Sequence, residues 1–180
     1  MMHIGHGYDV HALVEGRPLV LGGVHIDYKL GLEGHSDADV LTHALMDAIL
    51  GSLREGDIGC LFPDDDPAYL GADSLVLLHH VASLAKDRGA RIVDCDCTVA
   101  AQAPRLSPYR DQMRANLARA MGISADNVGV KATTTEHLGF VGRGEGIAAW
   151  SVVLLLDRPE RTVGPSTVAG AVESIHPEPS

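Results

Sequence analysis

Asp9 and His11 are the first residues of this 180-residue chain whose types and spacing could bind a metal ion. The neighbouring residues Ile4, Tyr8 and Val10 suit an extended strand. Side chains two residues apart in a strand point to the same face, so the carboxylate of Asp9 and the imidazole of His11 can converge on one point. Both groups are suitable ligands for a divalent ion such as zinc. Two ligands make an incomplete site, however, and an isolated Asp-x-His pair is more often a surface turn.

His43 offers a third ligand, on a segment that has the features of a helix start. Ser36 and Asp37 can accept hydrogen bonds from unpaired backbone N–H groups at such a start. Asp39, His43 and Asp47 then recur every four residues and share one face of the helix. Either carboxylate could orient the second ring nitrogen of the imidazole, although an ordinary solvated helix face would have the same pattern. Together with the strand pair, His43 would leave the fourth position of a zinc ion open, as catalytic zinc sites do.

The composition limits the classes to which the protein can belong. A length of 180 residues with 46% hydrophobic residues fits one domain, or one domain followed by a tail. The formal net charge of -10 argues against a surface that holds nucleic acid. Cys60, Cys95 and Cys97 form neither an even disulfide framework nor a paired metal motif, and the sequence has no signal-peptide pattern or stretch of membrane-spanning length. The expected location is therefore a reducing cytoplasm, with no membrane partner.

Hydrophobic periodicity and turn residues divide the chain into strands and helices. A hairpin is expected at 17–28, helices at about 38–53, 73–88 and 108–121, and strands at 91–101, 128–135 and 147–156. Turns and loops are expected at 55–59, 61–67, 102–108 and 139–146, and a disordered tail at 157–180. The hairpin and the short connections favour an α+β fold, in which a mixed or antiparallel sheet carries helices on one face. Because few aromatic residues remain to cover the other face, association with copies of the same chain is expected.

Several separated blocks of sequence, compared together, indicate a family. They are Gly5-His6-Gly7-Tyr8-Asp9-Val10-His11, His35-Ser36-Asp37-Ala38-Asp39, Gly56-Asp57-Ile58-Gly59 with Leu61-Phe62-Pro63-Asp64, and Lys131-Ala132-Thr133-Thr134-Thr135-Glu136 followed by Gly142-Arg143-Gly144-Glu145-Gly146. Each block is a weak motif, but their order and spacing together are specific. From about Met2 to Leu156 the chain closely resembles the 2-C-methyl-D-erythritol 2,4-cyclodiphosphate synthase family of the non-mevalonate isoprenoid pathway. Residues 1–156 are therefore expected to form one synthase domain.

The resemblance implies a phosphorus-oxygen lyase. It would convert 4-diphosphocytidyl-2-C-methyl-D-erythritol 2-phosphate into 2-C-methyl-D-erythritol 2,4-cyclodiphosphate and CMP. The 2-phosphate of the substrate is the nucleophile, so the enzyme has to fold a flexible polyanion and screen its charge rather than supply a covalent nucleophile. By similarity to the family, Asp9, His11 and His43 hold Zn2+, and Glu136 helps to bind Mg2+ or Mn2+ between the α- and β-phosphates.

The resemblance also implies which residues contact the substrate. His35 and Ser36 would contact the phosphate end of the methylerythritol unit, and His35 and Thr134 would stabilise the transition state. The full set of implied contacts covers the metal-binding strand, the methylerythritol pocket, the cytosine loop, the threonine run and an axial pocket: Asp9, Val10 and His11; Asp57, Ile58, Gly59, Phe62, Pro63, Asp64, Asp65 and Asp66; Ala101, Gln102, Ala103, Pro104, Arg105, Leu106 and Ser107; Thr133, Thr134, Thr135 and Glu136; Phe140 and Arg143.

Members of the family assemble as homotrimers with active sites at the subunit junctions, so the resemblance implies the same assembly here. Phe140, Arg143 and Glu145 correspond to a family pocket on the three-fold axis, where Arg143 could pair with an isoprenoid diphosphate. An arginine–glutamate cluster that locks the trimer explains these residues equally well.

Two other classes of protein would use the same residues. One is a zinc-dependent phosphodiesterase or nucleotide hydrolase, in which water at the open zinc position attacks instead of an internal phosphate. The other is a non-catalytic trimeric protein that binds metal or isoprenoid diphosphate. Glu136 and the run from Lys131 to Thr135 disfavour this second class, because retention of zinc alone does not need them.

Overall fold

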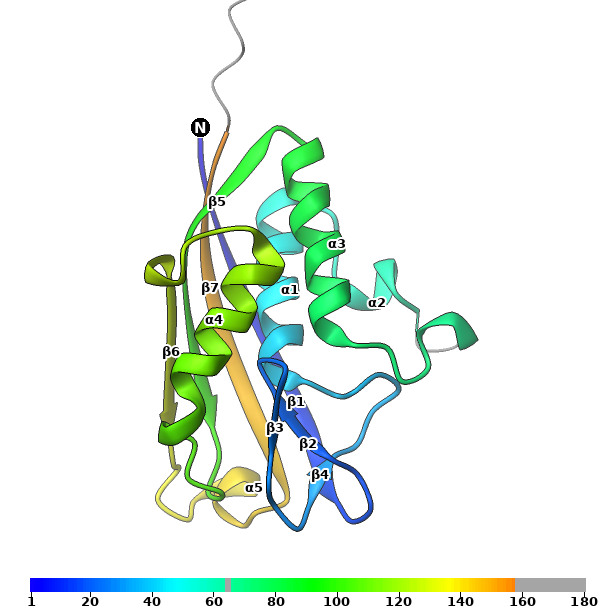
Figure 1. Cartoon of the computed structure of the whole chain (residues 1–180), viewed down its shortest axis with the longest axis vertical. Helices are drawn as coiled ribbons and strands as arrows, with labels where there is room; N and C mark the ends of the chain where they lie inside the picture. The colour runs from blue at the N-terminus through cyan, green and yellow to red at the C-terminus, as the bar shows by residue number, and fades with distance from the viewer. Residues whose placement is uncertain (64–65, 158–180) are drawn as a thin grey trace, which may run out of the picture.

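A computed structural model describes residues 1–63 and 66–157, which form a mixed five-stranded sheet with long helices on one face (Figure 1). The strand order is β4-β1-β7-β5-β6, and the strands are β1 (Met2–Val14), β4 (Gly31–Leu32), β5 (Ala90–Ala100), β6 (Val128–Thr133) and β7 (Gly146–Asp157). Strands β5 and β6 run parallel, whereas the other neighbours are antiparallel. The expected α+β fold with a mixed sheet is therefore confirmed.

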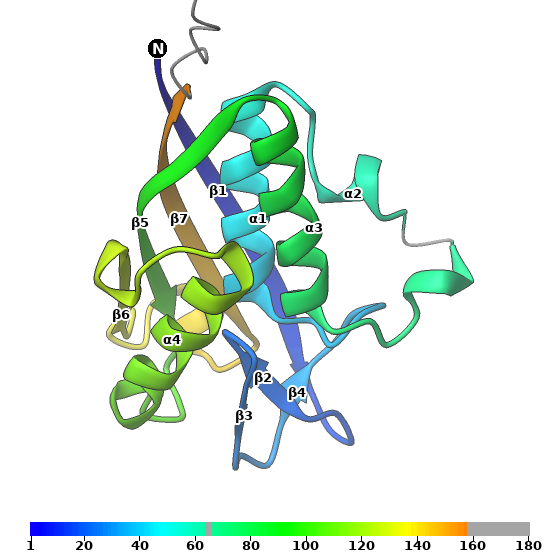
Figure 2. The same ribbon diagram turned by 45° about the horizontal axis from the view of Figure 1, so that its top comes forward.

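The long helices α1 (Val40–Leu53), α3 (Ser74–Asp87) and α4 (Arg110–Met121) cover one face of this sheet, with α1 between the sheet and α3 (Figure 2). A separate hairpin of β2 (Leu19–Leu21) and β3 (Val24–Ile26) turns at Gly22 and Gly23, as the sequence predicts. The main hydrophobic core lies between the sheet and the helices and includes most of α1. None of the helices in the described part of the chain has the length and apolar character needed to cross a membrane.

Some elements differ from the sequence-based expectation. A short helix α2 (Ile58–Leu61) forms where only a turn was expected, because the Asp57 carboxylate accepts the Cys60 N–H and caps it. Another short helix, α5 (Gly139–Gly142), lies within the glycine-rich segment that was expected to be a loop. The helix expected from 108 starts at Arg110, after a 3-10 turn over Ser107–Tyr109. Further 3-10 turns cover Pro67–Tyr69 and Ala125–Asn127.

The last strand also continues one residue further than expected. Asp157 ends β7 and pairs with the Met1 amino group and the His3 imidazole, at distances of 2.8 and 2.7 Å. These contacts fasten both ends of the sheet domain together and include a residue that was assigned to the tail. The rest of the expected tail, 158–180, lies outside the described residues.

Two buried glycines of β1 let helix α1 lie directly against the strand. A Cβ atom on Gly5 would come within 1.7 Å of the Ala48 carbonyl oxygen, and one on Gly7 within 1.9 Å of the Ala44 carbonyl oxygen. Only glycine permits this approach of helix backbone to strand backbone. Because β1 carries Asp9 and His11 further along the same face, the approach also sets how near His43 of α1 can come to them.

Gly7→Ala should therefore destabilise the protein. A methyl group at this position overlaps helix backbone rather than a movable side chain, so we expect the free energy of unfolding to fall by about 1–3 kcal/mol or more. Gly51→Ala is the matched control, because its Cβ meets nothing within 4 Å. In a helix this change should stabilise by up to about 1 kcal/mol. Urea unfolding monitored by circular dichroism compares the two variants, and equal stabilities would contradict the packing argument.

Along β1 and β7, the sheet face opposite the helices is largely apolar, and none of the described residues covers it. Its outward side chains alternate with the buried ones along β1 and β7, and Tyr8 packs against Trp150 with ring centroids 5.2 Å apart. The exposed large apolar residues on these strands are Met2, Ile4, Tyr8, Val10, Trp150 and Val152. An apolar face of this extent is typical of an interaction surface.

Candidate metal centre and active site

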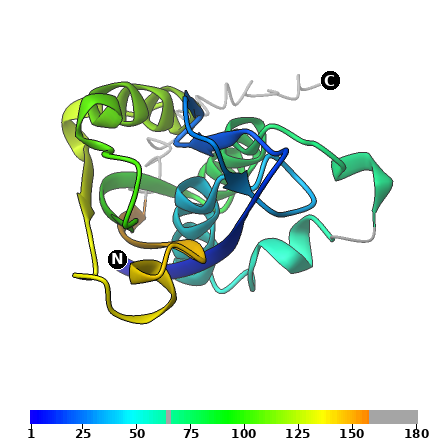
Figure 3. The same ribbon diagram turned by 90° about the horizontal axis from the view of Figure 1, so that it is seen from below.

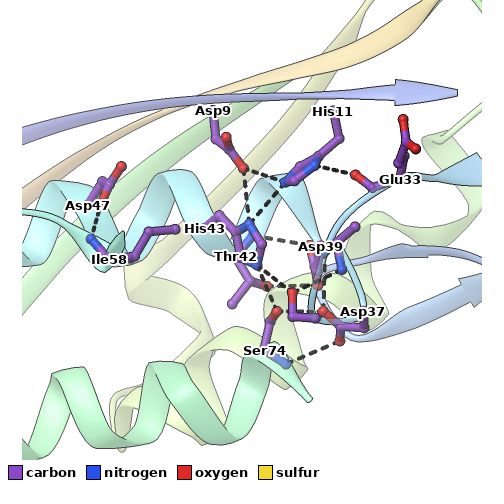
Figure 4. Close-up of polar contacts among 12 residues, drawn as sticks. Asp9, His11, Glu33, Asp37, Asp39, Thr42, His43, Asp47, Ile58 and Ser74 are labelled. Carbon is purple, nitrogen blue, oxygen red and sulfur yellow. Dashed lines mark hydrogen bonds and ion pairs between the residues drawn. The ribbon is translucent and has the colours of Figure 1, made fainter. Parts of the chain in front are cut away.

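The side chains of Asp9, His11 and His43 meet at one point between β1 and α1 (Figure 4). Asp9 Oδ2 lies 3.1 Å from His11 Nε2 and 3.1 Å from His43 Nδ1, and the two imidazole nitrogens are 3.2 Å apart. Tetrahedral zinc ligands at about 2.0–2.1 Å from the ion lie about 3.3 Å from one another, so these atoms fit one triangular face of such a site. Within residues 1–63 and 66–157 this is the one group of three or more His, Cys, Asp or Glu side chains that could hold a metal ion.

The electrostatics of this triad also suit a cation. Burial alone would raise the pKa of Asp9, but the hydrogen bonds and charges of His11 and His43 outweigh burial and hold that pKa well below its usual value. Burial lowers the pKa of His11, but Asp9 and the Glu33 carbonyl outweigh it and raise that pKa. The lowered pKa keeps Asp9 negatively charged, as a metal ligand has to be. A divalent ion at this point would compete with protonation of His11.

The other ring nitrogens of both histidines have fixed partners. His11 Nδ1 donates to the Glu33 carbonyl oxygen at 2.6 Å, which leaves Nε2 directed at the metal position. His43 Nε2 lies 3.1 Å from Ser36 Oγ and 3.0 Å from Ser74 Oγ, which leaves Nδ1 directed there. Such partners outside the ligand set orient the ligands and fix their protonation.

The two carboxylates that the helix periodicity placed beside His43 have other roles, so this part of the sequence prediction was wrong. Asp39 is the N-cap of α1 and accepts the N–H groups of Gly22 and Gly23 at 2.9 and 2.7 Å, which joins the hairpin to the helix. Asp47 accepts the Ile58 N–H at 2.9 Å and thereby holds the start of α2. Burial and the neighbouring charge of Asp37 raise the pKa of Asp39, and the donated hydrogen bonds oppose this rise.

A cavity of about 200 Å3 opens beside the triad. Residues that the sequence resemblance assigned to substrate line it together with the ligands, namely His35, Ser36, Ile58, Gly59 and Phe62. Sequence reasoning missed the apolar residues Met46, Tyr69 and Leu77, which also line it. Met46 follows His43 by three residues on the same helix, so the i,i+3 rule could have indicated it, whereas no local rule points to Tyr69 or Leu77. Tyr69 packs edge-on against Phe62, with centroids 5.3 Å apart.

The other residues expected at the methylerythritol pocket are placed differently. Asp57 caps α2. Val10, which was predicted to contact substrate from the metal-binding strand, has its side chain on the open sheet face. Pro63 and Asp66 are not among the residues that line the cavity, although the Asp66 carbonyl lies 3.3 Å from His35 Nε2. Asp64 and Asp65 lie outside the described residues.

The predicted cytosine-binding residues line a second cavity of about 350 Å3, which shares no residue with the first. It is formed by the loop from Ala101 to Ser107 together with Ala132, Thr133 and Thr134. Strands β7 and β5 lie between β1 and β6, a separation of about 14 Å at the usual strand spacing. The view from below shows α2 and its following loop on one side of the molecule and α4 with β6 on the other (Figure 3). One chain therefore holds the two predicted parts of the substrate site apart.

The remaining predicted residues belong to the segment between β6 and β7. Thr134 Oγ1 donates to Glu136 Oε1 at 2.8 Å, and Thr135 Oγ1 donates to the Leu138 carbonyl at 2.6 Å. Glu136 is exposed, has a φ of 51°, and is not part of the metal-binding triad. Further along this segment, Arg143 forms two hydrogen bonds to Glu145, at 2.7 and 2.9 Å, and Phe140 is partly exposed on the preceding helix α5.

Comparisons with known proteins agree with this arrangement. Residues 2–156 match the model of the YgbB family. A curated relative from Geotalea uraniireducens, named 2-C-methyl-D-erythritol 2,4-cyclodiphosphate synthase, is 64% identical over 154 residues, which are 86% of this chain and 98% of the relative. A relative of the same name from Geobacillus kaustophilus is 60% identical over 155 residues, which are 86% of this chain and 98% of that protein.

Solved structures support the same relationship. The bifunctional IspDF from Campylobacter jejuni is 43% identical with a TM-score of 0.84, and the match covers 87% of this chain but 43% of that longer one. IspF from Plasmodium falciparum, solved as a CDP complex, is 32% identical with a TM-score of 0.77, and the match covers 88% of this chain and 97% of that one. The chain therefore belongs to the YgbB family, whose curated relatives are named 2-C-methyl-D-erythritol 2,4-cyclodiphosphate synthases.

Proposed function

We propose that this protein converts 4-diphosphocytidyl-2-C-methyl-D-erythritol 2-phosphate into 2-C-methyl-D-erythritol 2,4-cyclodiphosphate and CMP. An oxygen of the substrate's 2-phosphate bonds to the β-phosphorus, the bond from that phosphorus to the oxygen bridging to the α-phosphorus breaks, and CMP leaves with the bridging oxygen. The observation that carries this proposal is the triad of Asp9, His11 and His43 beside a cavity lined by His35 and Ser36, in a chain of the YgbB family. Three protein ligands are typical of a catalytic zinc site.

The metal ions would supply charge neutralisation and polarisation of phosphate oxygens. Asp9, His11 and His43 would hold Zn2+, because two imidazoles and one carboxylate at tetrahedral spacing suit that ion. Glu136 would help to hold Mg2+ or Mn2+, which prefer oxygen ligands. Its carboxylate is exposed and fixed by Thr134, so it is accessible to a second ion.

The other residues would bind and orient the substrate. His35 and Ser36 can donate hydrogen bonds to its 2-phosphate end, and Ile58, Gly59 and Phe62 line the pocket for the methylerythritol unit. The loop from Ala101 to Ser107, with Thr133, would hold the cytidine, and Thr134 with His35 would stabilise the charge of the transition state. We also place this reaction in the cytoplasm, where the free cysteines of the chain stay reduced.

A homotrimer would bring the two separated cavities together. A single substrate has to span from the triad to the cytidine loop, yet the two cavities share no residue within one chain. If the cytidine loop of a neighbouring copy approached the triad, both parts could bind one substrate molecule. The open apolar sheet face supports such an assembly, since obligate interfaces are apolar and rich in aromatic residues. Arg143, with Phe140 nearby, would then lie close to the three-fold axis and could bind an isoprenoid diphosphate.

Trp150→Glu should disrupt the trimer. Trp150 lies on the open face against Tyr8, and aromatic residues at the centre of an interface contribute about 2 kcal/mol or more each. Every copy carries the substitution, so the effect is repeated at each interface, and we expect mostly monomer with greatly reduced turnover. Light scattering after size exclusion measures the mass. Val76→Glu, at a more exposed apolar position on α3, should leave the assembly unchanged. A trimeric Trp150→Glu variant would contradict the assignment of this face.

The decisive experiment identifies both products. The enzyme is incubated with the cytidyl substrate and Mg2+, and the mixture is followed by phosphorus NMR. The proposal requires CMP and the cyclic diphosphate, whereas a zinc-dependent hydrolase would give a linear phosphate. After removal of metal by a chelator, verified by metal analysis, turnover should vanish and return only with a divalent ion. Full turnover of the verified metal-free protein would overturn the metal scheme.

A further inference from the structure

Ser74 and Asp37 form a hydrogen-bonded chain to the metal-binding histidine, outside the residues assigned above. Ser74 is completely buried as the first residue of α3, and its Oγ lies 3.0 Å from His43 Nε2 (Figure 4). The same hydroxyl lies 2.5 Å from Asp37 Oδ1, and Asp37 Oδ2 accepts the Ser74 backbone N–H at 3.1 Å. Thus the carboxylate holds both the position of Ser74 and the orientation of its hydroxyl.

The donors and acceptors in this chain fix the position of a proton. An ionised carboxylate only accepts hydrogen bonds, so the Ser74 hydroxyl donates its hydrogen to Asp37. Its oxygen can then only accept from His43, which requires a hydrogen on His43 Nε2. A neutral imidazole with hydrogen on Nε2 has its lone pair on Nδ1. That is the nitrogen directed at Asp9 and His11.

This arrangement also determines what the hydroxyl hydrogen of Ser36 can bond to. Ser36 Oγ lies 3.1 Å from the same His43 nitrogen and accepts the Ala38 N–H at 3.1 Å. Because His43 Nε2 already carries hydrogen, the Ser36 hydroxyl cannot donate to it. Its hydrogen is therefore available for a ligand in the cavity that Ser36 lines. The hydrogen bonds from Asp37 through Ser74 to His43 would thus orient a metal ligand and leave the Ser36 hydroxyl free to donate to a phosphate.

We propose that Asp37 and Ser74 are positioning residues that hold His43 in the tautomer able to bind the metal ion. This inference rests on the proposed metal centre. Neither residue touches the ligand position, and both act through His43. Ser74 also joins α3 to the segment before α1, so the metal site depends on packing of two helices that are distant in sequence.

The test measures zinc affinity directly, by competition with a chromophoric chelator, and not through turnover. Ser74→Ala should weaken zinc binding about 10–100-fold, the usual effect of losing such an outer partner. Asp73→Ala is the matched control: Asp73 caps the same helix by accepting the Leu75 N–H at 2.8 Å and has no contact with His43. It should lower stability yet leave zinc affinity unchanged. Wild-type affinity in Ser74→Ala, or an equal loss in Asp73→Ala, would overturn the proposal.

A second measurement needs no substitution. Nitrogen NMR of zinc-loaded wild-type protein should show zinc on Nδ1 of His43 and hydrogen on Nε2. Zinc on Nε2 of His43 would refute the proposal even if Ser74→Ala failed to fold. Asp37→Asn should also weaken zinc binding, because an amide cannot accept hydrogen bonds from both the hydroxyl and the backbone N–H of Ser74. Absence of zinc binding in the wild type would instead refute the metal centre itself, so the two failures are distinguishable.

Discussion

His43→Ala is expected to abolish zinc binding and turnover together. His43 supplies one of three ligand atoms that lie 3.1–3.2 Å apart, and its loss leaves one carboxylate and one imidazole. Two ligands are too few for a stable zinc site, so we expect zinc affinity to fall roughly 100-fold or more. Turnover should fall by at least the same factor, because the phosphate oxygens lose the charge that polarises them. Metal analysis after dialysis and product formation from the cytidyl substrate measure the two effects.

The matched control for this variant is His25→Ala. His25 is exposed on β3 and lies outside both cavities, so its removal should change neither zinc content nor turnover. Because His43→Ala also loses the contacts to Ser36 and Ser74, its thermal unfolding has to be compared with that of metal-free wild type. A folded His43→Ala protein that kept both zinc and activity would show that the ligand assignment is wrong.

The metal triad could be predicted because its residues obey local rules. The two-residue period of a strand places Asp9 and His11 on one face, and a helical segment provides His43. Local rules cannot give the distance between that strand and that helix. In the structure this distance depends on Gly5 and Gly7. The backbone of α1 occupies the space that a side chain at either position would fill. The resemblance of the separated motifs to a known family, and not periodicity, indicated that the strand and the helix bring the three ligands together.

The contacts around the triad could not be predicted from local rules. Ser36, Asp37 and Asp39 all have side chains able to cap a helix, and only packing against the hairpin selects Asp39 as the cap of α1. Likewise, Ser74 lies 31 residues from His43 in the sequence, and no periodicity relates them. Periodicity states which residues share a face of one element but not which element lies opposite.

The two cavities show why the sequence order of motifs is a poor guide to their arrangement. Residues near the triad come from β1, α1, α2 and α3, whereas the cytidine loop follows β5 and contacts β6. Strands β7 and β5 lie between β1 and β6 in the sheet, although similarity assigns the two cavities to one substrate. Glu136 lies near the cavity at the cytidine loop, since it follows Thr134, which lines that cavity. Its function can therefore be tested separately from that of the zinc ligands.

Glu136→Gln is expected to keep zinc and lose turnover. The amide preserves the size of the side chain and can still accept the hydrogen bond from Thr134, but it lacks the charge that a second divalent ion needs. Glu136 lies outside the triad, so the zinc content should equal that of wild type. Turnover should fall about 100-fold or more if this ion neutralises the phosphates in the transition state. Glu136→Ala should behave in the same way.

Glu15→Gln makes the same chemical change at an exposed position outside both cavities and should leave turnover unchanged. A titration with Mg2+ or Mn2+ adds a test of mechanism. If Glu136 binds the second ion, the Gln variant should need more of that ion to reach its residual maximum rate, because a neutral oxygen is a weaker ligand for a hard cation. An unchanged requirement for the ion with reduced turnover would place Glu136 in substrate binding, and wild-type turnover would remove it from the active site.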